Sequence, residues 1–282
     1  MTQVWEGDAP EPGRPRIGWA GWARVLGRGL VLGAVTFGCL GLLLVVRLVE
    51  RPVFGLQRPM TPHITRFVCR SAFFILGMRF ATRGAPMRQH GAVVANHSSW
   101  LDIFALNAAQ TGYFVSKSEV AGWPAIGWLA RATGTVFIER RGAQALAQKT
   151  LFEARLRARH KLMFFPEGTS TDGLRVLPFK STLFAAFFAD GLDALLWVQP
   201  VTVIYTAPDG QDARFYGWWG DMDFGSHLVK TLAAPRQGGV EVVFHDPVRV
   251  GDFADRKALA AHCEAAVRGA FPGGGSAPYA LT

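Results

Sequence analysis

Residues 92–102 read Ala92-Val93-Val94-Ala95-Asn96-His97-Ser98-Ser99-Trp100-Leu101-Asp102, and this stretch decides the fold. Its four apolar residues predict a buried strand, and the polar residues after them predict a turn into a helix that begins near Trp100. In an unbroken helix, positions five apart are rotated by roughly 140°, so His97 and Asp102 could not touch. A strand-to-helix turn instead leaves Asp102 in the first helical turn, where its carboxylate can reach back to the imidazole. The stretch therefore predicts an α/β architecture and a paired histidine and aspartate.

A histidine paired with a carboxylate can act as a base. The carboxylate holds one ring nitrogen, fixes the tautomer and stabilises the imidazolium, while the other nitrogen accepts a proton. Such a base is worth roughly 10²–10⁴ in rate. Ser99 and Asp102 by themselves also fit a capping box, so the motif alone leaves a purely structural interpretation open. A nucleophilic serine is disfavoured, because Ser98 is the immediate neighbour of His97 and the chain has no Gly-x-Ser-x-Gly elbow.

A second motif, Phe165-Pro166-Glu167-Gly168-Thr169-Ser170, follows another apolar run, 162–165. Pro166 is expected to end a buried strand, and Gly168 permits a tight turn. Open α/β sheets bind their ligands at the carboxyl ends of the strands, so Glu167 could accept a hydrogen bond from a substrate hydroxyl. Lys180 follows and could bring a cation to the same place. The alternative is an ordinary loop with a solvated glutamate.

The rest of the chain agrees with an α/β domain. From about residue 84, short apolar runs are separated by several stretches of helical periodicity. The predicted strands are 92–95, 113–116, 135–138, 162–165, 201–205 and 240–244. The expected fold class is therefore α/β, with a mixed sheet flanked by helices and an N-terminal membrane-associated helical element.

The N-terminal element is predicted from an apolar segment. Residues 29–46 carry no charge and are flanked by Arg28 and Arg47, a length at the short end for a membrane helix. A membrane-embedded helix is preferred to a core helix. A second helix, 63–78, could lie in the membrane interface or pack on the catalytic domain. The expected division is a disordered segment (1–28), membrane-embedded or interfacial helices (29–80), a catalytic α/β domain (81–271) and a flexible tail (272–282).

The composition supports a membrane location. Hydrophobic residues make up 50% of the 282 residues, the formal net charge is +9, and the mean hydropathy is +0.17. Basic charge of this size suits nucleic acid, an anionic membrane surface or an acidic protein. The arginines are spread along the chain and no nucleic-acid module is visible, which favours the membrane. The three cysteines are widely spaced, so a disulfide framework or a zinc site is not expected and a reducing compartment is.

The two motifs in this order resemble those of the glycerolipid acyltransferase family, typified by 1-acylglycerol-3-phosphate acyltransferases. They are Asn-His-x-x-x-x-Asp at 96–102 and Phe-Pro-Glu-Gly-Thr at 165–169. Two weaker blocks agree, a glycine-to-arginine block at 134–140 and a proline–valine strand at 199–203. The resemblance covers roughly residues 60–250.

The resemblance implies a mechanism and a location. His97 would be the general base, oriented by Asp102, and would deprotonate a lysolipid hydroxyl that attacks an acyl thioester directly. The donor would be acyl-carrier protein or acyl-CoA, with no metal and no other cofactor. The catalytic domain would lie on the cytoplasmic side of the bacterial inner membrane. The residues expected to bind the acceptor are Arg140, Glu167, Gly168, Thr169, Ser170 and Lys180.

One departure bears on the acceptor. Family members that act on lysophosphatidate usually carry an arginine directly after Phe-Pro-Glu-Gly-Thr, and here that position is Ser170. A phosphate would lose a bidentate charged partner, which serine cannot replace. The longer stretch at 165–173 resembles the bacterial branch that acylates lyso-ornithine lipid, whose ammonium group Asp172 could meet. Lyso-ornithine lipid is therefore the expected acceptor. Lysophosphatidate is the alternative, because Arg140, Arg175 and Lys180 could still bind phosphate, and a catalytically dead binding protein is a remote third.

Overall fold

The structure is a computed structural model that describes residues 5–7, 10–13, 16–138, 145–189 and 191–271. Within these residues, an eight-stranded sheet has the order β1-β7-β6-β2-β5-β3-β4, and β8 pairs with β6. The strands are β1 Arg79–Arg83, β2 Gly91–Ala95, β3 Tyr113–Lys117, β4 Val136–Ile138, β5 Leu162–Phe164, β6 Trp197–Thr206, β7 Gly239–Phe244 and β8 Val248–Arg249. The helices are α1 Trp19–Phe54, α2 Thr61–Leu76, α3 Leu101–Ala109, α4 Ile126–Thr133, α5 Ala145–Arg157, α6 Phe224–Ala233 and α7 Arg256–Ala270.

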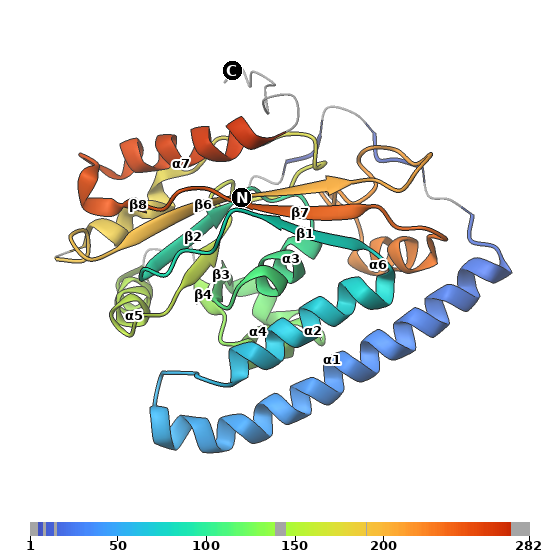
Figure 1. Ribbon diagram of the computed structural model, residues 1–282, viewed down its shortest axis with the longest axis horizontal. Helices are drawn as coiled ribbons and strands as arrows, with labels where there is room; N and C mark the ends of the chain where they lie inside the picture. The colour runs from blue at the N-terminus through green and yellow to red at the C-terminus, as the bar shows by residue number, and fades with distance from the viewer. Residues whose placement is uncertain (1–4, 8–9, 14–15, 139–144, 190, 272–282) are drawn as a thin grey trace.

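The sheet is mixed, as predicted. Strand β2 pairs in parallel with β5 and β6, whereas β6 and β7 run antiparallel. Helix α7 covers one face, and α2 and α3 lie on the other (Figure 1). Because both faces are covered, β2 is apolar throughout: Val93 and Ala95 belong to the core beside α2 and α3, and Ala92 and Val94 to the core beside α7. The parallel pairing of β2 and β5 brings the two motifs to the same edge of the sheet.

Strand β1 was not predicted. It pairs in parallel with β7, so the α/β domain begins at Arg79 rather than at residue 81. Its side chains are mostly exposed, because it lies at the end of the strand order. An exposed edge strand lacks the apolar run by which a buried strand is recognised.

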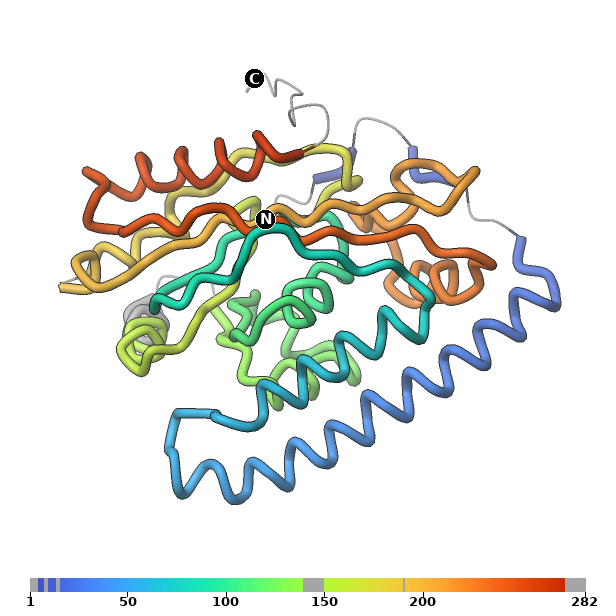
Figure 2. The backbone as a smooth tube through the Cα atoms, viewed as in Figure 1, coloured from blue at the N-terminus to red at the C-terminus, as the bar shows by residue number. Residues whose placement is uncertain are grey.

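Helices α1 and α2 run antiparallel along one side of the domain (Figure 2). Helix α2 buries Cys69, Phe73 and Leu76 in the core, so it packs on the catalytic domain. Helix α1 has 36 residues, and among them only Gly21, Leu43 and Glu50 are buried. It is long and apolar enough to cross a membrane, with a mean hydropathy of 2.5 in its most apolar window. This exposed apolar surface is compatible with the predicted membrane-embedded helix.

The N-terminal boundary differs from the expected one. Helix α1 begins at Trp19, so residues 19–28 are helical and not disordered. Arg24 Nε donates to Ala233 O at 2.8 Å, and Arg28 Nη1 donates to Leu232 O at 2.8 Å and to Ala234 O at 2.7 Å. These carbonyls end α6, where a helix has unpaired acceptors and a negative dipole end. The predicted tail, 272–282, lies outside the described residues.

The other end of α1 is also held. The Glu50 side chain is fully buried and accepts hydrogen bonds from Met60 N at 2.7 Å and from Thr61 N at 3.1 Å, at the start of α2. A carboxylate at a helix N-terminus satisfies free N–H groups and complements the helix dipole. Gln57, in the connection between the two helices, donates to Ala158 O at 2.5 Å after α5. The α1–α2 pair is therefore fastened to the domain near both ends of α1.

Candidate active site

The turn after β2 is built by Asn96, whose side chain is fully buried. Its Nδ2 donates to Val203 O at 2.9 Å, and its Oδ1 accepts from Val203 N at 2.8 Å. The amide thus pairs with the backbone of β6 as another strand residue would. This pairing fixes the point at which the chain leaves the sheet, and His97 follows directly.

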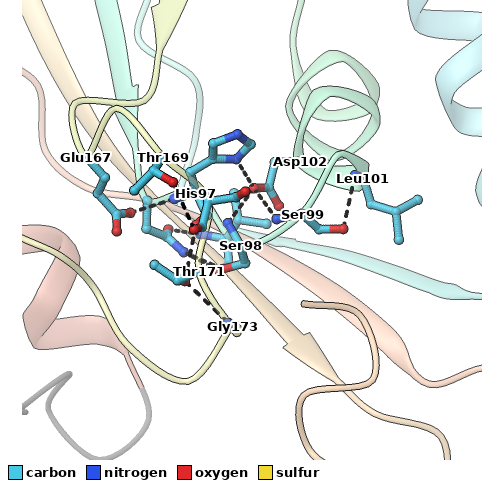
Figure 3. A network of polar contacts seen from close by, with 12 residues as sticks. His97, Ser98, Ser99, Leu101, Asp102, Glu167, Thr169, Thr171 and Gly173 are labelled. Carbon is cyan, nitrogen blue, oxygen red and sulfur yellow. Dashed lines mark hydrogen bonds and ion pairs between the residues drawn. The ribbon is translucent and has the colours of Figure 1, made fainter. Parts of the chain in front are cut away.

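His97 and Asp102 meet as predicted (Figure 3). His97 Nδ1 lies 2.7 Å from Asp102 Oδ2. The same carboxylate oxygen accepts from Ser98 N at 2.7 Å and from Ser99 N at 2.9 Å, while Tyr205 OH donates to Oδ1 at 2.7 Å. Asp102 thus holds the imidazole and also makes half of the predicted capping box, because it accepts from Ser99 N while Ser99 Oγ accepts from Leu101 N at 3.3 Å and not from Asp102 N. Since a carboxylate only accepts, Nδ1 carries the proton and Nε2 is left as an acceptor.

The imidazole lies against the second motif. The His97 ring stacks on Phe165 with centroids 4.0 Å apart and an interplanar angle of 6°. The His97 side chain is 19% exposed and Asp102 is fully buried. The ring is thus held in plane by Phe165 and at one nitrogen by Asp102, and part of it faces solvent. This is the arrangement that a base needs in order to meet a bound hydroxyl.

Glu167 has a role that the sequence did not predict. Its side chain is buried, and one oxygen accepts from His97 N at 2.6 Å (Figure 3). The other oxygen accepts from Leu177 N at 2.8 Å. Burial raises the pKa of the Glu167 carboxyl well above its usual range. Both oxygens are occupied, so Glu167 positions the backbone of His97. Contact with an acceptor stays a prediction, and it would require one of these bonds to open.

Replacing Glu167 with glutamine is expected to change how stability depends on pH. Because the folded-state pKa is raised, the unfolded chain loses this proton above about pH 4.5, while the folded chain keeps it up to a higher pH. The contribution of Glu167 to the free energy of unfolding is complete at low pH and is lost as pH rises through the folded-state pKa. Between the two pKa values, the free energy of unfolding falls by up to about 1.4 kcal/mol per pH unit. Glu167→Gln should lack this component, which thermal unfolding of both proteins from pH 4 to 8 would reveal. Parallel profiles would contradict it.

The remaining predicted acceptor residues lie around this loop. Gly168 has φ of 72°, a conformation that favours glycine. Thr169 Oγ1 accepts from Trp5 N at 3.3 Å and donates to Ser170 O at 3.3 Å. The half-buried Lys180 donates its backbone N–H to Pro166 O at 3.0 Å, which closes the loop. Arg140 lies outside the described residues. The structure thus brings all of these residues except Arg140 to one loop, and their contact with an acceptor stays a prediction.

Asp172 and Arg175 are paired with each other. Arg175 Nη2 donates to Asp172 Oδ2 at 3.1 Å, and the Asp172 side chain is only 5% exposed. The Arg175 guanidinium also lies 4.9 Å above the Trp5 ring. Asp172 was expected to meet an ammonium group and Arg175 was available for a phosphate. Each already has a partner of opposite charge within the chain.

Several groups that shape the site were not predicted from the sequence. Tyr205 ends a predicted strand, and a polar tip at the carboxyl end of a strand was the signal that could have drawn attention to it. Trp100 Nε1 donates to His227 Nδ1 at 3.0 Å, and His227 Nε2 donates to Gly217 O at 2.9 Å. Because an indole N–H only donates, this buried histidine is neutral with its proton on Nε2, and burial lowers its pKa to about 3. The network fixes the start of α3.

In the described residues, no group of three or more histidine, cysteine or acidic side chains could hold a metal ion. The polar groups around His97 are an imidazole, a buried carboxylate and backbone groups. Such a set can take a proton from a hydroxyl and return it to a leaving group.

Comparison with known proteins gives consistent matches. The acyltransferase family model matches residues 79–204. The chain is 61% identical over 269 residues to lyso-ornithine lipid O-acyltransferase from Rhodobacter capsulatus, which covers 95% of this chain and 97% of that protein. It is 38% identical over 132 residues to 1-acyl-sn-glycerol-3-phosphate acyltransferase from Neisseria gonorrhoeae, 46% of this chain and 50% of that protein.

A solved structure has the same fold. The crystal structure of 1-acyl-sn-glycerophosphate acyltransferase from Thermotoga maritima matches with a TM-score of 0.61 and covers 88% of this chain and 92% of that one. At 21% identity, this likeness concerns the fold alone. The identity to the Rhodobacter capsulatus protein extends over nearly the whole of both chains. This chain therefore belongs to the acyltransferase family.

Proposed function

We propose that this acyltransferase moves an acyl chain from a thioester donor to the hydroxyl of lyso-ornithine lipid at a membrane. The observation that carries the chemistry is the His97–Asp102 pair, with Nδ1 held at 2.7 Å and Nε2 left to accept a proton. The acceptor is supported by the 61% identity to the Rhodobacter capsulatus enzyme and by Ser170, which stands where lysophosphatidate enzymes usually carry an arginine.

The proposed reaction needs only this pair and the two substrates. Nε2 of His97 takes the proton of the lysolipid hydroxyl as its oxygen attacks the thioester carbonyl carbon. A carbon–oxygen bond forms, the carbon–sulfur bond breaks, and the thiolate leaves with the proton from the imidazolium. Asp102 stabilises the imidazolium between these steps. Tyr205 and two backbone N–H groups hold Asp102 in place throughout.

Charge and location support the other expected partners. The net charge of +9 suits an acidic acyl-carrier protein or the phosphates of acyl-CoA as donor. The exposed apolar face of α1 supports attachment to a membrane, and the three free cysteines suit the reducing cytoplasmic side of a bacterial inner membrane. Lysophosphatidate is the second candidate acceptor, since the chain also matches the Neisseria gonorrhoeae enzyme, although over only half of that protein.

The acceptor is tested by offering the purified full chain labelled acyl donor with either lyso-ornithine lipid or lysophosphatidate. We expect acyl transfer to lyso-ornithine lipid to exceed transfer to lysophosphatidate by about 10–100-fold, because a missing charge-assisted bond is worth about 1.5–3 kcal/mol. Ser170→Arg should narrow this ratio by supplying a guanidinium for the phosphate. Product from lysophosphatidate alone would reject the proposed acceptor and leave the acyltransferase chemistry standing.

A further inference from the structure

A basic cavity lies at the opposite end of the parallel strands from His97. Its volume is about 350 Å³. It is lined by the α1–α2 connection and by the residues at the start of β2, β3 and β5. His97 follows the carboxyl end of β2, whereas the cavity is at the amino end, so a whole strand separates the two. The cavity is therefore distinct from the proposed active site.

The side chains of this cavity are cationic without an acidic partner. It is lined by four cations and three histidines but by no aspartate or glutamate, and these basic residues are Arg58, Arg88, Arg159, Lys161, His63, His90 and His160. Arg58 Nη1 donates to Ala132 O at 2.7 Å, and Lys161 Nζ donates to Met87 O at 2.6 Å. Backbone carbonyls orient these two cations without cancelling their charge. The lining thus carries no acid of its own, although Glu50 of α1 also acts on Arg58, and its excess of positive charge lies in a partly desolvated place, where an anion binds strongly.

Two buried groups of the lining have hydrogen-bonding capacity left. His160 is 3% exposed, and neither of its ring nitrogens makes a hydrogen bond of normal geometry, although the backbone of Leu56 lies close enough to raise its pKa. The same holds for the buried Nε of Arg58. Burial, followed by the positive charges of Arg155 and Arg58, lowers the pKa of His160 to about 4. Buried polar groups normally have partners, and a guanidinium N–H can only donate, so the Nε of Arg58 points to a ligand that accepts hydrogen bonds.

The surroundings of the cavity indicate where that ligand comes from. Phe54 at the end of α1, and Leu56 and Met60 of the α1–α2 connection, are 47%, 53% and 45% exposed, and they continue the apolar face of α1. Cations beside the end of an apolar membrane helix lie at the level of lipid phosphates. The proximity of the cavity to this rim favours a phosphate carried by a lipid over a phosphate free in solution.

We infer that this cavity binds the phosphate group of an anionic membrane phospholipid. The inference rests on the proposed membrane location, but it does not depend on the identity of the acceptor. Arg88 and Arg159, which are exposed, meet the phosphate together with the half-buried Arg58 and Lys161. The bound lipid would hold the α1–α2 connection against the sheet, at the end remote from catalysis.

The test uses the full chain in a neutral detergent and native mass spectrometry. Phosphatidylglycerol, phosphatidylcholine and inorganic phosphate are titrated separately. The cavity variant is Arg88→Gln with Arg159→Gln. The matched control is Arg256→Gln with Lys257→Gln, which removes the same charge from exposed positions at the start of α7. Helix α7 covers the face of the sheet opposite to α2 and α3 (Figure 1). Acyl transfer in neutral micelles is measured for each protein.

Wild type and control are expected to retain one phosphatidylglycerol tightly, and the cavity variant should bind it at least about tenfold more weakly, because two charge-assisted contacts are lost. Acyl transfer in neutral micelles should be the same in all three proteins. Equal phosphatidylglycerol binding by the two variants, or equal binding of phosphatidylcholine by wild type, would overturn the inference. Tighter binding of inorganic phosphate than of phosphatidylglycerol would contradict the inference that the bound phosphate belongs to a lipid. Loss of acyl transfer in every protein, with the binding difference intact, would count against the proposed function alone.

Discussion

Replacing His97 with alanine is expected to lower kcat for acyl transfer by about 10²–10⁴, because the substitution removes the base that Asp102 and Phe165 hold in place to take the hydroxyl proton. The imidazole is fixed on two sides, by Asp102 at 2.7 Å and by Phe165 at 4.0 Å between ring centroids. A base already in position loses little entropy as the reaction begins, so its removal acts mainly on the chemical step. Single-turnover assays with labelled donor would measure it.

The control for this variant is His262→Ala. That histidine is exposed on α7 and far in the chain from both motifs. It should keep wild-type activity, and thermal unfolding should be similar for all three proteins, since the His97 side chain is partly exposed. Equal activity of wild type and His97→Ala would remove the catalytic assignment of the histidine.

Asp102→Asn should lower kcat by a comparable factor, about 10²–10⁴, without unfolding the chain. The amide oxygen can keep the bonds from His97 Nδ1 and from the Ser98 and Ser99 N–H groups. The amide nitrogen would then face Tyr205, whose hydroxyl can rotate to accept in place of donating. Every hydrogen bond can survive and only the negative charge is lost. The expected defect is therefore a failure to stabilise the imidazolium.

Asp102→Ala would not separate the loss of the negative charge from a loss of stability. It would leave the buried N–H groups of Ser98 and Ser99 without an acceptor, which costs about 1–3 kcal/mol for each. Activity and unfolding temperature of Asp102→Asn should be compared at several pH values. An active Asp102→Asn enzyme with an unchanged pH profile would show that the aspartate is only a helix cap.

Local patterns predicted most of the fold, and long-range contacts account for what they missed. The six predicted strands are present, because each is short, apolar and bounded by polar or turn residues. The pairing of His97 with Asp102 was accessible because it spans five positions. Tyr205 and Glu167 reach the same turn from 103 and 70 residues away. In a single sequence, no local pattern predicts contacts between residues so far apart in the chain.

Glu167 shows why residue type alone does not settle a role. An acid after a buried strand suggested a ligand contact, yet its partners are two backbone N–H groups, which every residue except proline carries. The start of α1 was missed for a related reason. Residues 19–28 are rich in glycine and arginine, and their helix is stabilised by carbonyls at the end of α6. Tertiary contacts there outweigh local composition.

Helix α1 is fastened near its start by Arg24 and Arg28 and near its end by Glu50. Because Glu50 bonds the start of α2 and α2 packs on the domain, these contacts limit how far α1 can pivot against the domain. When α1 lies in a bilayer, Nε2 of His97 therefore stands at one fixed height relative to the lipid. Only a lysolipid that presents its hydroxyl at that height can be acylated, so the enzyme would select by depth as well as by charge. In a bilayer, membrane thickness would then bear on which acceptor is used.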